Sequence, residues 1–211
     1  IALAEQGFPV SPRLHQLLQH DPALRDNPAA RALFFDAHGQ ALAVGARLIN
    51  PFLAATLRQV ADQGPGAFYR GELARAMVAA VASHPVPGSL GEADLAAYQP
   101  INRAALCGPY RAHTVCGMPP PSSGATTVLA TLGILSRFEL AQVRPGSAFF
   151  AHLFAEAGRL AYADRDSYLA DPDFADVPTA GLVAPDYLAG RAAAIRVDQS
   201  LGKAAPGTPR G

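Results

Sequence analysis

The sequence predicts a predominantly α-helical protein with a small antiparallel β element. Several segments carry apolar residues three and four positions apart and are bounded by helix caps and by Gly or Pro stops. Alanine, the strongest helix former, is abundant. The clearest strand pattern lies in residues 104–116. Hydrophobic residues make up 50% of the 211 residues and charged residues 16%, which is typical of a globular protein with a real core.

The beginning of the chain is expected to hold two short helices followed by irregular structure. Residues 1–8 read as the end of a helix. Ser11-Pro12 supplies an N-cap and a first-turn proline for the next helix. Residues 26–48 are expected to be irregular, with Leu33–Phe35 as a candidate strand before a turn at His38-Gly39.

Three helices are expected in the stretch that follows. Asn50-Pro51 begins the first of them, and Gly64-Pro65 ends it. The second runs from about Gly71 to Ser83 and has an apolar face. The motif Ser89–Glu92 matches a capping box, so a short helix is expected to continue through Ala97.

The predicted β element contains both cysteines of the chain. Two short strands are expected around a turn at Gly108-Pro109. With that turn, Cys107 faces a residue near Ala112 or His113, and Cys116 lies several strand rises of about 3.3 Å away. This separation exceeds the Cα limit of about 7 Å for a disulfide. Two free thiols are therefore the preferred prediction, and a disulfide is the alternative.

The second half of the chain is expected to hold three more helices. They span about residues 125–135, 147–169 and 185–196. Three prolines at Pro119–Pro121 exclude helix and central strand just before the first of these helices. A single α-rich domain is predicted over residues 1–198, followed by a flexible tail over 199–211.

Charge and residue spacing exclude several classes of function. The formal net charge is zero, which provides no footprint for nucleic acid, and no stretch is long and apolar enough to span a membrane. The histidines show no metal-ligand spacing, so no metal or other cofactor is predicted. Asp164 and Asp166 point about 200° apart on a helix and cannot share an acid–base site. Asp164 is expected to pair with a neighbouring arginine, and Asp171–Asp176 lacks the Gly and Glu of a calcium loop.

Two segments carry a more specific signal. Tyr110–Thr127 contains MPPPSSG, and Ala155–Gly181 reads AEAGRLAYADRDSYLADPDFADVPTAG. Together and in this order, they resemble the large subunit of γ-glutamyltransferases (γ-glutamyltranspeptidases) and of the related cephalosporin-acylase-like enzymes. The pieces LAEQGFPVSPRL, QGPGAFYRGELA and EADLAAY fit as well, so the resemblance covers about Ile1–Ile195. Ala125 and Ala170 depart from the family pattern, which usually has glycine at both places.

The resemblance implies the C-terminal portion of a large subunit, within an αββα N-terminal-nucleophile hydrolase. Such a precursor cuts itself, and the new N-terminal Thr of the small subunit attacks a γ-glutamyl amide such as glutathione. The acyl group then passes to water or to an amino-acid amine, while backbone N–H groups stabilise the oxyanion. The alternatives are a cephalosporin-acylase-like amidohydrolase on the same scaffold, or an inert structural fragment. Thr126-Thr127 begins a helix and is not followed by His, so no catalytic residue is predicted in this chain, and the isolated chain is expected to be inactive.

The proline-rich loop is the candidate site. The resemblance implies that Pro120, Pro121, Ser122 and Ser123 form part of the wall of the substrate pocket. Ser122 or Ser123 is also expected to cap the following helix. Neither serine lies in a GxSxG motif, so neither is predicted to be a nucleophile. The implied partners are the small subunit of the same precursor and a γ-glutamyl small molecule, in a periplasmic or extracellular location. An exposed apolar patch is expected where the partner would pack.

Overall fold

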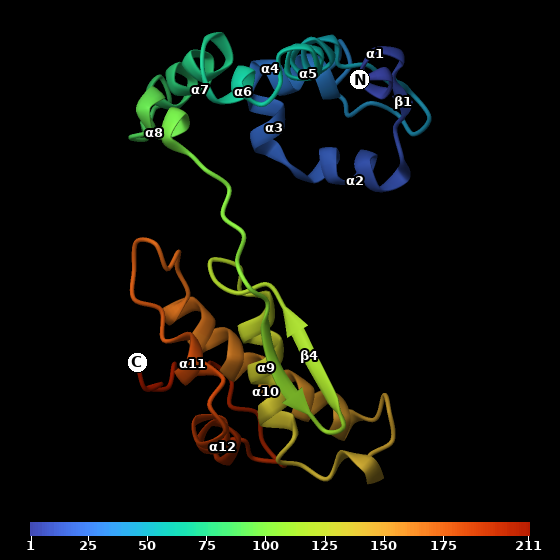
Figure 1. The fold of residues 1–211 in the computed structure, drawn as a ribbon. Helices are drawn as coiled ribbons and strands as arrows, with labels where there is room; N and C mark the ends of the chain where they lie inside the picture. The colour runs from blue at the N-terminus through green and yellow to red at the C-terminus, as the bar shows by residue number, and fades with distance from the viewer. The chain divides into compact units, whose positions relative to one another are not determined.

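The computed structural model describes residues 1–211 and divides them into two compact units, Ile1–Pro100 and Ile101–Gly211 (Figure 1). Each unit consists mainly of helices and holds one two-stranded antiparallel sheet. The predicted fold class, predominantly α with a small antiparallel β element, is confirmed. Each of the two units buries apolar residues of its own, and the single domain over residues 1–198 stays a prediction. No helix combines the length and apolarity required to cross a membrane.

The first unit is built from eight short helices and one pair of two-residue strands. The helices are α1 (Ala2–Gln6), α2 (Pro12–His20), α3 (Pro22–Asp26), α4 (Pro28–Phe34), α5 (Pro51–Gln63), α6 (Gly66–Tyr69), α7 (Glu72–Ala82) and α8 (Glu92–Ala97). Strand β1 (Phe8–Pro9) pairs with β2 (Arg47–Leu48). Four of these helices begin with proline, and in each the preceding side chain accepts a backbone N–H. These caps are Ser11, Asp21, Asn27 and Asn50.

Two expectations for the first unit are wrong in detail. Residues 26–48 contain helix α4, because Asn27 caps it and Pro28 begins it. Leu33 therefore lies in a helix, and only Phe35 of the candidate strand makes a β-bridge, with Ala41. The cap of α8 is Gly91, whose N–H donates to the Asp94 carboxylate at 2.8 Å, and the predicted Ser89 motif is not used.

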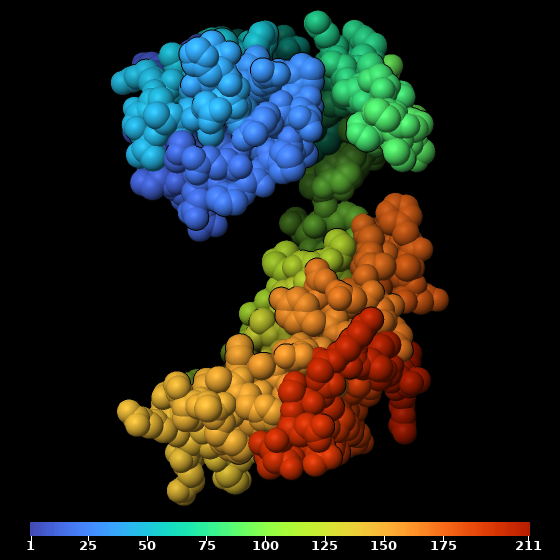
Figure 2. Space-filling model, turned by 180° about the vertical axis from the view of Figure 1, so that it is seen from behind, coloured from blue at the N-terminus to red at the C-terminus, as the bar shows by residue number.

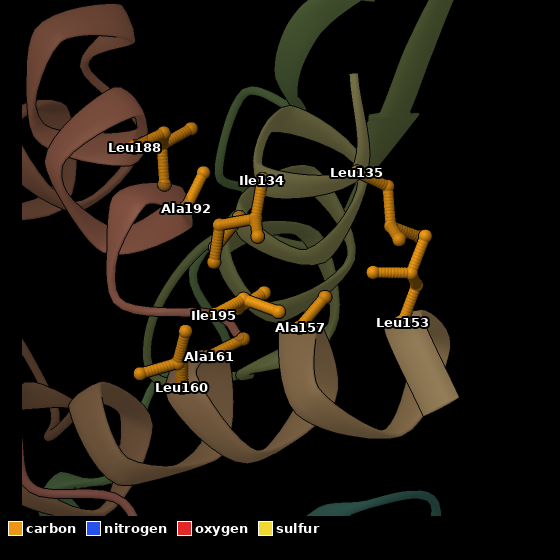
Figure 3. Close-up of a cluster of buried hydrophobic side chains, with 10 residues drawn as sticks. Ile134, Leu135, Leu153, Ala157, Leu160, Ala161, Leu188, Ala192 and Ile195 are labelled. Carbon is orange, nitrogen blue, oxygen red and sulfur yellow. The ribbon is translucent and has the colours of Figure 1, made fainter. Parts of the chain in front are cut away.

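The second unit packs three helices around one hydrophobic core. Its helices are α9 (Gly124–Leu135), the 3-10 turn η1 (Leu140–Gln142), α10 (Ala148–Tyr168), α11 (Thr179–Leu182) and α12 (Pro185–Ala193). Side chains from α9, α10 and α12 point toward one another (Figure 3). Ile134, Leu153 and Ala157 are completely inaccessible to solvent. The long α10 therefore supplies much of the surface against which the rest of the unit packs.

The predicted hairpin is present, but its turn lies elsewhere. Strand β3 (Leu106–Tyr110) pairs with β4 (His113–Gly117), and the turn falls at Arg111-Ala112. Gly108 lies within β3, where a Cβ would come within 3.0 Å of the Leu129 side chain, so this glycine permits close packing rather than a turn.

The corrected register brings the cysteines together. Cys107 lies directly opposite Cys116, with their Cα atoms 4.1 Å apart. The two residues form a disulfide, so the preferred prediction of two free thiols is wrong. The error follows from the misplaced turn, because a turn three residues later makes this pair face each other across the strands.

Residues 199–211, for which a flexible tail is predicted, contact the rest of the second unit. They make hydrogen bonds to α10 and α12, and Leu201 and Ala204 pack against the core of the second unit. Figure 2 shows the red C-terminal residues lying against the orange part of the chain.

Several large apolar side chains are exposed on the first unit. A hollow of about 410 Å³ lies between α1, β1 and α5. Leu3, which lines this hollow, is 71% exposed, and Phe52 on α5 is 85% exposed. Exposed apolar surface of this kind usually marks an interface.

Candidate functional site

The proline-rich loop connects β4 to α9 and is held by hydrogen bonds at its end. The Ala125 N–H donates to the Met118 carbonyl at 3.1 Å. The Gly124 N–H donates to the Ser122 hydroxyl at 3.2 Å, a local bond that precedes the helix. Ser123 is the N-cap by position, but its side chain makes no capping bond. The loop therefore has a defined path into the helix.

A polar hollow lies between this loop and the C-terminal end of α10. Its volume is about 330 Å³. It is lined by Pro121, Ser123, Arg165, Asp166 and Leu169. The two segments that carry the sequence signal, MPPPSSG and AEAGRLAYADRDSY, therefore meet in space. Had they lain apart, the resemblance would have lost its structural meaning.

Only two of the four predicted site residues line the hollow. Pro121 and Ser123 face it, whereas Pro120 is buried behind the loop and Ser122 is used at the start of α9. The loop forms a turn at Pro120-Pro121 and a bend at Ser122, so neighbouring side chains face different sides of it.

Sequence reasoning missed two residues of this hollow. An Arg165 Nη donates to the Asp166 carboxylate at 2.6 Å, and the guanidinium lies 5.6 Å from the centre of the Tyr162 ring. The pair presents a cationic donor and an anionic acceptor side by side, which suits a ligand that carries both polar groups. Their position three and four residues before Leu169, on the helix that ends in the aspartate motif, is the signal that could have identified them.

The neighbouring Asp164 lies in the interior of the second unit, where it pairs with an arginine. Its carboxylate is 3.0 Å from the Arg191 guanidinium of α12, and both side chains are largely buried. Burial and the adjacent Asp164 carboxylate raise the pKa of the Tyr187 hydroxyl well above its ordinary value. The expected pairing of Asp164 with an arginine is thus present, and these groups lie inside the unit rather than in the hollow.

The aspartates after α10 bind an arginine and shape a turn. Arg103 lies 2.6 Å from the Asp173 carboxylate and 3.5 Å from that of Asp171. The Asp173 N–H donates to Asp171 at 3.1 Å. These contacts join the residues just before β3 to the end of α10. The structure contains no group of three or more side chains placed to hold a metal ion.

Solved transpeptidases and acylases share this fold. The γ-glutamyltranspeptidase from Pseudomonas nitroreducens has a TM-score of 0.81 at 31% identity, over 97% of this chain and 61% of that chain. The cephalosporin acylase from Bacillus halodurans has a TM-score of 0.80 at 30% identity, over 98% of this chain and 38% of that chain. The architecture is therefore that of an enzyme class in which both transpeptidases and acylases occur.

The chain belongs to the γ-glutamyltranspeptidase family, whose model matches residues 1–209. It is 36% identical over 209 residues to the glutathione hydrolase proenzyme of Bacillus subtilis strain 168, and the aligned region covers 99% of this chain and 35% of that protein. It is 37% identical over 201 residues to the acylase ACY 1 proenzyme of Pseudomonas sp. strain V22, and the aligned region covers 95% of this chain and 36% of that protein. The chain thus spans about a third of the length of these curated relatives.

Proposed function

We propose that this chain is part of a precursor that cuts itself and, once mature, transfers or hydrolyses γ-glutamyl amides such as glutathione. The attacking group would be an N-terminal Thr carried on another polypeptide, the small subunit of the same precursor. The observation that supports the proposal is the meeting of the MPPPSSG loop and the ADR segment of α10 around one hollow. Relatives of both kinds, glutathione hydrolases and acylases, are proenzymes.

In this proposal the chain supplies a wall of the substrate pocket and no nucleophile. The loop Pro120–Ser123 would form that wall, with Pro121 and Ser123 facing the substrate. The serine hydroxyls have no acid and histidine partners, which a nucleophilic serine requires. The isolated chain is therefore expected to be inactive.

The test uses the full-length precursor. Purified precursor should convert to two bands on a denaturing gel, and mass spectrometry should find Thr at the new N-terminus. The mature protein should release p-nitroaniline from a γ-glutamyl anilide, whereas residues 1–211 alone should not. A precursor that stays intact and inactive, or turnover by residues 1–211 alone, would contradict the proposal.

An acylase acting on a β-lactam side chain is the second candidate. The identity to the acylase proenzyme, 37%, equals that to the glutathione hydrolase within one percentage point. Activity on a γ-glutamyl anilide and on a cephalosporin side-chain amide should be measured in the same preparation. A much larger kcat/KM for the cephalosporin amide would favour the acylase.

The wall role of the loop can be tested separately. Ser123→Ala should raise KM with little change in kcat, because a wall contact contributes equally to substrate and transition state. Ser122→Ala is the matched control, since this serine belongs to the same loop and does not line the hollow. Equal KM values for the two variants would contradict a role of Ser123 in the pocket wall.

We also propose export to the periplasm or the cell exterior. The Cys107–Cys116 disulfide supports it, because disulfides persist in oxidising compartments and are rare in the cytosol. Cell fractionation followed by thiol trapping should find the protein outside the cytosol with both cysteines blocked. Recovery of the reduced protein in the cytosol would contradict this location.

A further inference from the structure

Residues 200–207 lie across α10 and α12 as a strap that is anchored at both ends. The strap has no helix or strand of its own. Its first anchor is Glu156 and its second is Asp164, both on α10 and both nearly inaccessible, with 1% and 3% of their surfaces exposed. They are two of the three buried polar or charged residues of the chain. Buried carboxylates are costly unless they are fully paired, so their partners indicate what they do.

Glu156 uses both of its oxygens to hold the start of the strap. One accepts the Ser200 hydroxyl at 2.7 Å, and the other accepts the Leu201 backbone N–H at 2.8 Å. Arg159 lies 3.4 Å from the carboxylate and also donates to the Gly202 carbonyl. Burial alone would raise the pKa of Glu156, but the bonds from Leu201 and Ser200 and the charge of Arg159 outweigh it and lower that pKa. The first anchor is therefore a charged group.

Asp164 holds the end of the strap together with Arg191. Its carboxylate accepts the Gly207 N–H at 2.8 Å and pairs with Arg191 at 3.0 Å. Arg191 also donates to the Ala205 carbonyl at 2.9 Å, and the Tyr168 hydroxyl donates to the Gly207 carbonyl at 2.6 Å. Most of these bonds end on backbone atoms, so they fix the path of the segment.

The fit of the strap is specific at Gly207. A Cβ at this position would overlap the Tyr187 hydroxyl and press on the Arg191 side chain. The two anchors are eight residues apart on α10, which corresponds to about 12 Å along the helix axis. The six steps from Leu201 to Gly207 could extend to about 20 Å, so the segment is held with some slack between two fixed points.

We propose that Glu156 and Asp164 are positioning residues for maturation. These two residues fix residues 200–207 on the second unit. They thereby direct the next part of the precursor into the cleavage site along one path. This inference rests on the proposed self-cleaving precursor. A purely stabilising role would not require charged anchors, since an apolar contact of equal volume stabilises as well or better. What the carboxylates add is the recognition of backbone N–H groups, which defines a path.

The chain offers an internal probe of the strap. Its only lysine, Lys203, is exposed and lies between the two anchors. A lysine-specific endoprotease therefore cuts residues 1–211 at a single bond inside the strap. Glu156→Ala and Ser200→Ala should speed this cleavage by about tenfold to a hundredfold, because each removes hydrogen bonds to a charged group. Glu139→Gln is the matched control, since Glu139 is an exposed carboxylate of the same unit without a side-chain hydrogen bond. Cleavage at equal rates in all variants would overturn the anchoring.

Maturation is measured in the full-length precursor that carries the same substitutions. The Glu156→Ala and Ser200→Ala precursors should mature at least about tenfold more slowly than the unmodified precursor, while Glu139→Gln matures at the original rate. Glu156→Gln retains one of the two acceptors and should mature at an intermediate rate. Ser200→Ala removes the hydroxyl donor to Glu156 but leaves the Leu201 N–H and Arg159 in place, so its melting temperature should fall less than that of Glu156→Ala, and maturation is compared at a temperature at which every variant is folded.

The outcomes separate the two proposals. If the unmodified precursor never cleaves itself, the proposed function fails and the positioning role fails with it. If the unmodified precursor cleaves but every variant matures equally fast, the proposed function stands and the positioning role is wrong. Slower maturation that parallels faster cleavage at Lys203, measured at a temperature at which every variant is folded, supports the positioning role.

Discussion

Removing the Asp164 carboxylate should destabilise the second unit through the Arg191 that it leaves behind. In the folded unit the two groups are 3.0 Å apart, and their side chains are 4% and 12% exposed. Breaking a buried ion pair by deleting one partner costs about 3–5 kcal/mol. Arg191 still donates to the Leu160 and Ala205 carbonyls after the change, so we place the cost of Asp164→Ala near the lower end, at about 3 kcal/mol.

A double-mutant cycle isolates the interaction between the two groups. Arg191→Met keeps much of the side-chain volume and should cost about 3 kcal/mol, because it strands the buried carboxylate. The double variant strands neither charge, so we expect it to cost about 4 kcal/mol instead of 6. The coupling energy is then about 2 kcal/mol.

Hydrogen exchange followed by mass spectrometry is the suitable assay, because the chain has two units and no tryptophan. Peptides from α10 and α12 should lose protection in both single variants, and peptides from α5 serve as the internal control in the other unit. Single-variant costs that add within about 0.5 kcal/mol in the double variant would refute the coupling. Loss of protection in α5 to the same extent would show that the change acts on the whole chain.

Three further outcomes can be measured on residues 1–211. Leu153→Ala should destabilise the second unit by about 2–5 kcal/mol in a urea titration, because Leu153 is fully buried. Phe174→Ala is the control: its side chain is 90% exposed, so the unfolding free energy should change by less than about 0.5 kcal/mol. The pKa of Glu156 is lowered in the folded unit, so its charge is stabilising above the ordinary value of 4.5, and this contribution is lost as the pH falls through the lowered value. The protection factors of amides in residues 200–207, which compare each exchange rate with the intrinsic rate at the same pH, should therefore fall on acidification. Protection factors that do not change with pH would contradict the charged anchor. Replacing both Cys107 and Cys116 by Ala should cost about 2–3 kcal/mol, as expected for a closed loop of this short length, and an unchanged melting temperature would argue against the disulfide.

Local sequence signals predicted the helices that carry their own start and stop. Asn50-Pro51 and Ser11-Pro12 each combine a side-chain cap with a first-turn proline, and both begin helices where expected. Asn27-Pro28 carries the same signal and begins α4, in a stretch that was expected to be irregular. The information was present there, but the helix is only seven residues long and buries none of them, so it shows no apolar face.

The hairpin shows where a local signal misleads. Gly-Pro is a strong turn dipeptide, yet Gly108-Pro109 lies within β3. The reason is a tertiary contact, since Gly108 lets the strand approach Leu129 of α9. The turn instead uses Arg111 at a positive φ of 54°, which is uncommon for a residue with a side chain and not readable from composition. The misplaced turn also made the prediction for the cysteines wrong, because their pairing depends on the strand register.

The sequence likewise predicted only part of the candidate site. The motifs identified the loop and the helix that meet, but the facing of Pro121 and Ser123 toward Arg165 and Asp166 depends on packing between segments about 40 residues apart. Ser122 and Pro120 belong to the same motif and face elsewhere. A motif therefore identified the right segments without resolving which of their side chains share the hollow.

The strap was missed although α10 itself contains a readable trace of it. The buried positions of α10 recur at helical spacing, namely Leu153, Glu156, Ala157, Leu160, Ala161 and Asp164. Two acids on the face that packs into the core contradict the amphipathic pattern, because such positions are otherwise apolar. A carboxylate is stable there only when donors reach it. Since the two arginines of the helix cannot satisfy every carboxylate oxygen, backbone N–H groups from elsewhere must supply the rest, and Leu201 and Gly207 do so. Composition alone describes residues 199–211 as a mobile tail, whereas the two misplaced acids indicate that a segment binds to α10.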